Sequence, residues 1–250
     1  MRFRLGAYDV TRPLVIDPVF TFSTYLDGTD ADNIAAVTTD SGQNIYVTGF
    51  TRSTDFPTQN AVQAKWGGAD DIFITKLDPT GHTLIYSTYL GGSDEDFGAT
   101  IAVDSNGDAI VGGISSSTDF PHAGSVPSSS YQTTYSCYFV ASLKPDGSAF
   151  NYVGKIGGGQ GSSYANGNNG RLTVDVFGNA YLTGVTDAPN FQITPGTLTS
   201  TVPGYPDTST FILKVDPTGK LLYSTVIPGN AAHNGVSVRV DRNGCSKVFI

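Results

Sequence analysis

The residue types that most often carry catalysis or bind metals are scarce in this 250-residue chain, which has three His, two Cys and one Glu. No two of the His and Cys residues have the spacing of a zinc site. No His lies near a Ser in a Gly-x-Ser-x-Gly motif, and the Gly-rich stretch 157–170 lacks the Gly-Lys-Ser/Thr ending of a phosphate-binding loop. Paired carboxylates meet only in space, so glycoside chemistry stays open. We predict no catalytic residue and no cofactor-binding residue.

Charge and long apolar runs are also scarce. Charged residues make up 14% of the chain, and the formal net charge of −8 disfavours contact with a phosphate backbone, so we expect no nucleic-acid partner. No apolar run is long enough to span a bilayer, so no membrane insertion is expected. Residues 1–8 carry two Arg but no apolar core of a signal peptide.

The two cysteines, Cys137 and Cys245, fall in predicted strands that are far apart in the chain. A disulfide between them would have too far to reach, so we expect buried or half-buried free thiols. Scarce Cys together with abundant Ser, Thr, Tyr and Gly is compatible with a secreted or cell-surface bacterial protein.

Four short alternating segments joined by turn residues organise the sequence. They are residues 72–77, 84–90, 101–103 and 109–111. Asp-Pro-Thr-Gly follows the first and Asp-Ser-Asn-Gly follows the third, and both have turn chemistry. No window has the apolar spacing of a helix. The pattern predicts antiparallel strands joined by hairpins.

The same unit returns along the chain. Its Asp-containing turn begins at Asp40, Asp104, Asp175 and Asp241. Four antiparallel strands repeated in tandem are typical of β-propeller blades, because a small twisted sheet must cover its faces with the next one. We place the small Ile-Ala-Val-Asp strand innermost, where blades converge, and the Tyr-rich strand outermost.

We therefore predict an all-β protein, a β-propeller of four-stranded antiparallel blades with three complete blades plus partial ones, in an open arc or an incomplete ring. A lead-in segment covers residues 1–18 and the repeats cover 19–250. The predicted parts are blades at about 34–90, 100–155 and 171–227, a partial blade at 236–250 and a lone outer strand at 19–26.

An open arc would leave apolar blade faces exposed, so we expect a fragment of a longer propeller. The alternative is a tight four-blade ring, in which residues 19–26 complete the blade begun by residues 236–250.

Three phrases carry a family resemblance: NIYVTGFTRSTDFPT, DIFITKLDPTGHTLIYSTYLGG and IAVDSNGDAIVGG. They resemble the SBBP family of bacterial tandem seven-bladed β-propeller repeats, and the resemblance covers about Pro13 to Ile250. It implies a propeller in a large, secreted or surface-attached protein with further repeats. The family supplies no catalytic residues to carry over.

Two loops share the sequence Ser-Thr-Asp-Phe-Pro, with Asp55 and Asp119 as their acidic residues, and a trace recurs before Phe191. We expect the Asp to cap the turn through its own backbone, the Phe to plug a blade edge and the Pro to fix the exit. The alternative is a ligand-contacting loop. The acidic cluster at residues 94–96 is interpreted as solvated loop charges, or as a cation-binding channel mouth.

Oxygen-bearing side chains alternate at Asp104, Asn106 and Asp108, as in calcium loops. The downstream bidentate Glu of such loops is missing, and a hairpin turn explains the pattern. Asp104, Asn106 and Asp108 are thus weak metal candidates, and calcium is the only cofactor considered. The first functional hypothesis is a non-catalytic extracellular scaffold or binding module for a protein or glycan. The alternatives are a hydrolase or lyase with a funnel site, and a calcium-stabilised adhesive domain.

Overall fold

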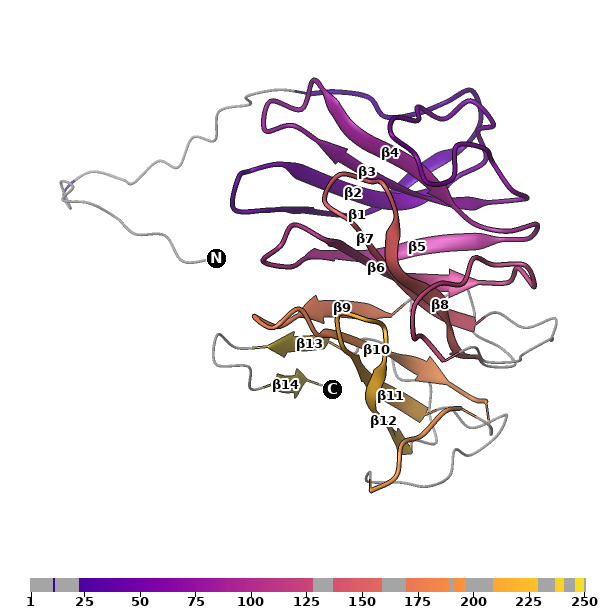
Figure 1. Ribbon diagram of the computed structural model, residues 1–250, viewed down its shortest axis with the longest axis vertical. Coiled ribbons are helices and arrows are strands. Elements are labelled where there is room, and N and C mark those ends of the chain that lie inside the picture. Colours follow the sequence, from indigo (N-terminus) through magenta and orange to yellow (C-terminus); the bar gives the residue numbers. More distant parts are fainter. Residues whose placement is uncertain are drawn as a thin grey trace.

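The computed structural model describes residues 11, 23–127, 137–158, 170–188, 191–196, 209–228, 237–240 and 246–249. Within these ranges every regular element is a β-strand, which confirms the all-β prediction. The strands form three four-stranded antiparallel sheets and one two-stranded sheet. The sheets follow one another along the long axis of the molecule, with the first sheet in the chain, blade 1, at the top of Figure 1.

Each four-stranded sheet is one blade, and its strands pair in chain order. Blade 1 consists of β1 (Asp32–Thr39), β2 (Ile45–Thr51), β3 (Asp71–Leu77) and β4 (Leu84–Leu90). Blade 2 consists of β5 (Asp96–Val103), β6 (Ala109–Ser115), β7 (Cys137–Leu143) and β8 (Phe150–Gly158). Blade 3 consists of β9 (Arg171–Val174), β10 (Ala180–Thr186), β11 (Ser209–Val215) and β12 (Leu221–Pro228). The partial blade consists of β13 (Ser237–Val240) and β14 (Ser246–Phe249).

Alternation along β3 shows why these segments become strands. Ile72 and Ile74 pack into the core between blade 1 and blade 2. Phe73 lies between them in sequence and packs into a separate cluster on the other face. Every residue of β3 is buried, because side chains gather on both faces of the sheet.

The hairpin turns depend on glycine where the backbone enters the left-handed region. Gly81 has φ 73° and Gly107 has φ 86°. Each closes a turn by donating its backbone N–H to the carbonyl of the turn Asp, with an N–O distance of 3.0 Å to Asp78 and 3.2 Å to Asp104. The Asp-x-x-Gly pattern therefore sets where the chain reverses in these two hairpins, whereas in the β1–β2 turn Gln43 takes the left-handed position, with φ 64°.

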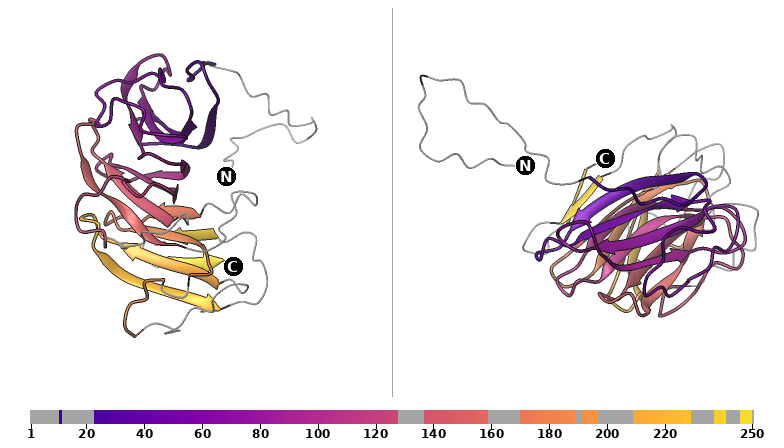
Figure 2. Two further views of the ribbon diagram at one scale, coloured as in Figure 1. Left: turned by 90° about the vertical axis from the view of Figure 1, so that its right-hand side faces the viewer. Right: turned by 90° about the horizontal axis from the view of Figure 1, so that it is seen from above.

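The small strand of each repeat lies innermost, as predicted. β1 contacts β5, β5 contacts β9, and β9 contacts β13. The side view shows the blades following one another along an arc (Figure 2). Small and β-branched residues suit these strands because the innermost strands of neighbouring blades converge and leave little room for large side chains.

Among the described residues, one apolar core lies between blades 1 and 2 and another lies between blades 2 and 3. The core between blades 1 and 2 includes Tyr46, Leu90, Val111 and Phe139. The core between blades 2 and 3 includes Tyr138, whose hydroxyl donates to the carbonyl oxygen of Val185 at 2.9 Å. Burial of apolar area between sheets is the main stabilising contribution of such stacking.

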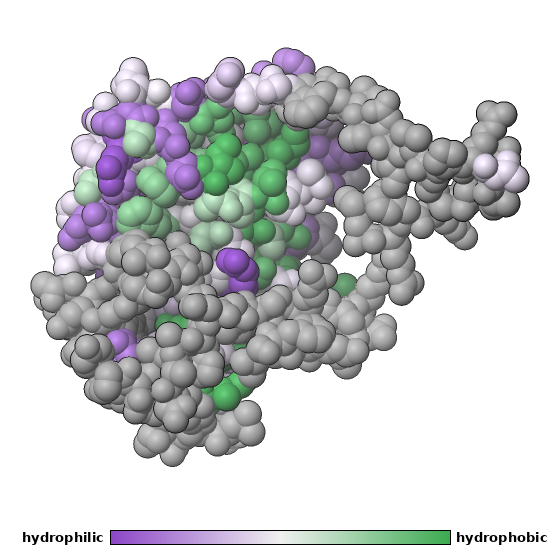
Figure 3. All heavy atoms as spheres, turned by 180° about the vertical axis from the view of Figure 1, so that it is seen from behind, coloured by the Kyte–Doolittle hydropathy of each residue, from purple (hydrophilic) through white to green (hydrophobic). Residues whose placement is uncertain are grey.

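One face of blade 1 has no described blade against it. We call it the uncovered face, and Val37, Val47 and Phe73 lie on it. Ile34 and Val37 of β1 are 56% and 65% exposed. Apolar residues gather on the back of the upper part of the molecule, where blade 1 lies (Figure 3). The apolar exposure expected of an open arc is therefore seen at β1, while Val47 and Phe73 on the same face are buried.

Two predicted boundaries need correction. Residues 23–26, the described part of the predicted outer strand 19–26, belong to no strand. A strand needs a hydrogen-bonded neighbour, and these residues pair neither with β14 nor with any other described strand. The first strand of blade 2 begins at Asp96 rather than near residue 100, because Asp96 pairs with Ser115 of β6. The pairing expected for a four-blade ring is therefore not seen among the described residues.

Cys137 is buried and forms no disulfide, as expected. Cys245, His233 and residues 159–169 of the Gly-rich crossover lie outside the described residues.

Candidate functional site

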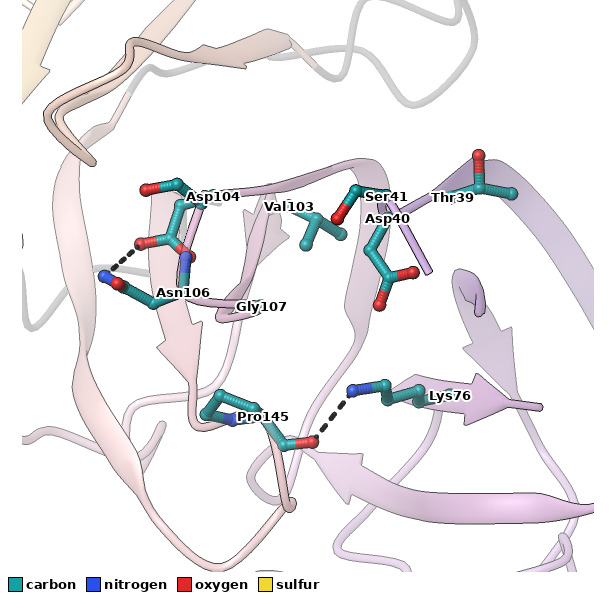
Figure 4. Close-up of a pocket in the computed structure, with 10 residues that line it drawn as sticks. Thr39, Asp40, Ser41, Lys76, Val103, Asp104, Asn106, Gly107 and Pro145 are labelled. Atoms are coloured by element: carbon teal, nitrogen blue, oxygen red, sulfur yellow. Dashed lines mark hydrogen bonds between the residues drawn. The ribbon is translucent and has the colours of Figure 1, made fainter. Parts of the chain in front are cut away.

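A pocket of about 520 Å³ lies between blade 1 and blade 2, among the hairpin turns (Figure 4). The β1–β2, β5–β6 and β7–β8 turns form most of its wall. We call it the turn pocket. It is lined by Thr39, Asp40, Ser41, Lys76, Val103, Asp104, Ser105, Asn106, Gly107 and Pro145.

Asp40 is held in place by its own turn. Its Oδ1 accepts from the Asn44 backbone N–H at 2.9 Å, and its Oδ2 accepts from Asn44 Nδ2 at 2.8 Å. The Tyr46 hydroxyl lies 3.0 Å from Asp40 Oδ2 and 3.3 Å from the Gly107 carbonyl oxygen of blade 2. Desolvation alone would raise the pKa of Asp40, but these hydrogen bonds outweigh it and the pKa is lowered. Asp40 therefore stays ionised.

Lys76 reaches into the turn pocket from β3 (Figure 4). Its Nζ donates to the carbonyl oxygen of Pro145 in blade 2 at 3.1 Å and lies 4.9 Å from the centroid of the Tyr46 ring. An ammonium group has three N–H donors. One of them links the two blades by its bond to Pro145.

The weak metal candidates Asp104, Asn106 and Asp108 lie together in the β5–β6 turn. Asp104 Oδ1 accepts from the backbone N–H groups of Asn106 and Asp108, both at 2.9 Å. Asp104 Oδ2 accepts from Asn106 Nδ2 at 3.1 Å. Burial raises the pKa of Asp108, against a hydrogen bond from Asn151 that lowers it. The Asp104 carboxylate is thus engaged by the donors of its own turn.

Blade 3 repeats this turn. Asp175 Oδ1 accepts from the backbone N–H groups of Phe177 and Asn179, both at 2.9 Å. Its Oδ2 lies 3.6 Å from the Lys214 ammonium. Three equivalent aspartates therefore have one structural task, which is to satisfy the N–H groups of a tight turn. Across the described ranges, no three or more His, Cys, Asp or Glu residues are grouped to hold a metal ion.

Most residues that line the turn pocket are polar, and among them no nucleophile is hydrogen-bonded to a base. Ser41 and Ser105 are exposed hydroxyl groups at its rim. The two described histidines lie outside its lining, His82 in an exposed turn and His122 with its Nε2 2.9 Å from the Val126 carbonyl oxygen.

A second cluster of hydrogen bonds lies on the loops that enter blades 1 and 2, and we call it the crossover clasp. In blade 2, Gly92 N and Ser117 Oγ donate to Asp96 Oδ2 at 2.7 and 2.8 Å. Ser93 donates to Asp119 Oδ1 from its N at 2.8 Å and from its Oγ at 2.9 Å. The clasp ties the entry of β5 to the loop that follows β6.

Blade 1 has the same clasp. Gly28 N and Ser53 Oγ donate to Asp32 Oδ2 at 2.6 and 3.1 Å. Thr29 donates to Asp55 Oδ1 from its N and its Oγ1, both at 3.0 Å. In blade 3, Ala188 stands where blades 1 and 2 have the serine, so its side chain offers no hydroxyl group.

The clasp corrects two predictions made from the sequence. Asp94 is exposed, as a solvated loop charge would be, but Asp96 is fully buried at the start of β5. Asp55 and Asp119 bind the preceding crossover in addition to their own turn. The hydrogen bond from the Thr29 backbone is the largest influence that lowers the pKa of Asp55. The sequence signal for the clasp is a Gly-x-x-x-Asp spacing, which is present at both crossovers as Gly28–Asp32 and Gly92–Asp96.

The predicted aromatic plug is confirmed in all three blades. The ring centroid of Phe56 lies 4.6 Å from that of Phe73. The corresponding distance is 5.1 Å between Phe120 and Phe139. In blade 3 it is 4.8 Å between Phe191 and Phe211.

A family model described as SBBP, Beta-propeller repeat, matches residues 85–121. The chain carries an SBBP repeat. The matched residues run from β4 through β5 and β6 to the loop of Phe120, so they contain the whole clasp of blade 2. A comparison with curated proteins found no match. Among the described residues, no helix has the length and apolar character needed to cross a membrane.

Proposed function

We propose that this β-propeller chain is a non-catalytic binding module that recognises a protein or glycan partner at the turn pocket. The observation that carries the proposal is the polar lining of that pocket. It combines an ammonium donor from Lys76 with serine hydroxyls, while the nearby Asp40 and Asp104 are already hydrogen-bonded. Hydroxyl and amide groups of a partner both donate and accept, so they match such a surface.

A hydrolase or lyase would need acids or histidines that converge where a substrate can reach them. Asp71 and Asp96 do converge, but both are 0% exposed and neither lines the turn pocket. This burial favours the binding module over the enzyme.

The same proposal places the module in a secreted or cell-surface protein with further repeats. Scarce cysteine and abundant Ser and Thr are compatible with this location. The exposed Ile34 and Val37 support a further blade against the uncovered face.

A glycan and peptide array, followed by calorimetric titration of the best binder, tests the binding site. Ser105→Arg places a long side chain over the rim of the turn pocket and should weaken binding at least tenfold. Thr54→Arg, an exposed residue of the Asp55 loop that does not line the pocket, is the matched control and should bind as the unchanged chain does. Full binding by Ser105→Arg, or turnover of the ligand, would contradict the proposal.

A further inference from the structure

Two carboxyl groups meet inside the junction of blades 1 and 2. Asp71 begins β3 and Asp96 begins β5, and both side chains are 0% exposed. A Cβ built on Gly91 would lie 2.5 Å from Asp71 Oδ1 and 2.9 Å from Asp96 Oδ2. The two groups therefore approach the same stretch of backbone, and only glycine leaves room for both.

One oxygen of each carboxyl group is well satisfied. Asp71 Oδ2 accepts from Gly67 N at 2.8 Å and from Gln63 Nε2 at 3.1 Å. Asp96 Oδ2 accepts from Gly92 N and Ser117 Oγ in the crossover clasp. The Oδ1 atoms of Asp71 and Asp96 are buried and form no hydrogen bond. The Ser115 hydroxyl group on the paired strand β6 lies close enough to lower the pKa of Asp96, but it makes no bond to Asp96 Oδ1. A buried carboxylate oxygen without a donor is costly, and two such charges close together are costlier.

Among the described residues, no cationic side chain forms an ion pair with Asp71 or Asp96. The titratable and charged groups around the pair are Arg52, Asp70, Tyr89, Glu95, Asp119, Cys137 and Lys155. Arg52 Nε is committed to Asp70 at 2.8 Å, and Lys155 Nζ donates to the Ser117 carbonyl oxygen at 2.6 Å. Neither ion pair that the structure shows among the described residues includes Asp71 or Asp96.

We propose that Asp71 and Asp96 together hold a proton in the folded chain and so make the blade 1–blade 2 junction pH-sensitive. Protonation of either carboxyl group removes one of two buried charges, and at Asp71 Oδ1 it converts an unpaired acceptor into a donor. The proton comes from solvent and returns to it, so no other reactant is needed. The inference does not rest on ligand binding at the turn pocket.

The titration behaviour agrees with this geometry. Burial raises the pKa of Asp71 to about 7, and repulsion from Asp96 adds to the rise. Burial also raises the pKa of Asp96 to about 6, against its hydrogen bonds. Because the two groups interact, these values belong to the pair.

The direction of the pH effect follows from these raised values. In the unfolded chain both groups titrate near the ordinary Asp pKa of about 3.9. Their contribution to folding is therefore complete below about pH 4 and is lost as the pH rises through about 6 to 7. The junction should loosen between pH 5 and pH 8.

Urea unfolding of the 250-residue chain from pH 5 to pH 8 tests the inference. The unfolding constant of the unchanged chain should rise at least about tenfold over this range. Asp71→Asn keeps an acceptor for Gly67 and places an NH₂ group toward Asp96, so it should remove most of the rise. Asp78→Asn, in the exposed turn after β3, is the control and should retain it.

Three results would overturn the inference. One is an unfolding constant that does not change with pH, and another is the full pH dependence in Asp71→Asn. The third is a result at pH 8 in which calcium chloride stabilises the unchanged chain and EDTA does not. If calcium chloride also failed to stabilise Asp71→Asn, a cation and not a proton would occupy the site. If Asp71→Asn does not fold, the infrared band of a protonated carboxyl group at pH 6 in the unchanged chain decides, and its absence would refute the proposal.

Discussion

The two faces of blade 1 are made by the same strands but have different surroundings. On the face toward blade 2, Ile72 and Ile74 are 0% exposed. On the uncovered face, Val37 is 65% exposed, whereas Ile101, at the same position of the next repeat, is 7% exposed. Each stands three residues before the turn aspartate. The neighbouring sheet, and not the strand's own sequence, decides which apolar residues are buried.

Parts of the uncovered face are nevertheless protected within the repeat. Phe73 is 0% exposed because Phe56 stacks on it, and Leu26 and Trp66 pack beside this cluster. The aromatic plug therefore partly replaces a missing neighbour near the loop end of the sheet. Further along β1, no plug reaches Ile34 and Val37.

The largest expected effect concerns Phe139, which lies in the junction core. Phe139→Ala should destabilise the chain by about 3–5 kcal/mol, because a cavity opens between two sheets. Phe73→Ala, the equivalent change on the uncovered face, should cost less, because water can enter the space. Urea unfolding measures both, and Phe177→Ala in an exposed turn is the control. If both substitutions lowered the unfolding free energy equally, the two faces of a blade would not differ in how much they contribute to stability.

An intermediate effect is expected for the crossover clasp. Ser117→Ala removes the hydroxyl donor to Asp96 and should cost about 1 kcal/mol. Ser53→Ala makes the same change in blade 1, where Asp32 is only partly buried, and should cost less. Thermal unfolding of both variants compares the clasp beside a covered face with the clasp beside an uncovered one. A larger loss for Ser53→Ala would contradict the reasoning.

A smaller effect, of opposite sign to that of the buried pair, is expected at Asp40. Its folded pKa is lowered, so its contribution to stability is present above the ordinary Asp pKa and is lost as the pH falls through the lowered value. Asp40→Asn should therefore lessen the acid sensitivity of the chain below pH 4 and leave the pH 5–8 range unchanged. Acid unfolding followed by circular dichroism measures this, and a changed dependence above pH 5 would argue against it.

The smallest effect is expected from chelation. The Asp104 oxygens accept hydrogen bonds from their own turn, so EDTA should leave the melting temperature unchanged. Calorimetry with and without calcium measures it. A melting temperature that falls with EDTA, and a loss of this fall in Asp104→Asn, would favour the calcium-stabilised alternative.

The sequence was enough to predict the strands and turns, because alternation and Asp-x-x-Gly turns are local properties. It was not enough to predict the burial of Asp96. An acidic run favours solvent, and the donor Ser117 lies in a different loop that only the folded blade brings near. The turn pocket could not be predicted for the same reason, since Lys76 and Pro145 meet only across the blade 1–blade 2 junction. Contacts between blades depend on how the sheets stack, which repeat spacing alone does not specify.

Paired substitution at the equivalent positions Ile101 and Val37 tests most directly the claim that stacked sheets bury one another. Urea unfolding of the 250-residue chain should show that Ile101→Asp costs about 3 kcal/mol or more, because the charge enters the core between blades. Val37→Asp should change the unfolding free energy by about 0.5 kcal/mol or less, because its side chain faces solvent. Similar losses at both positions would contradict the account.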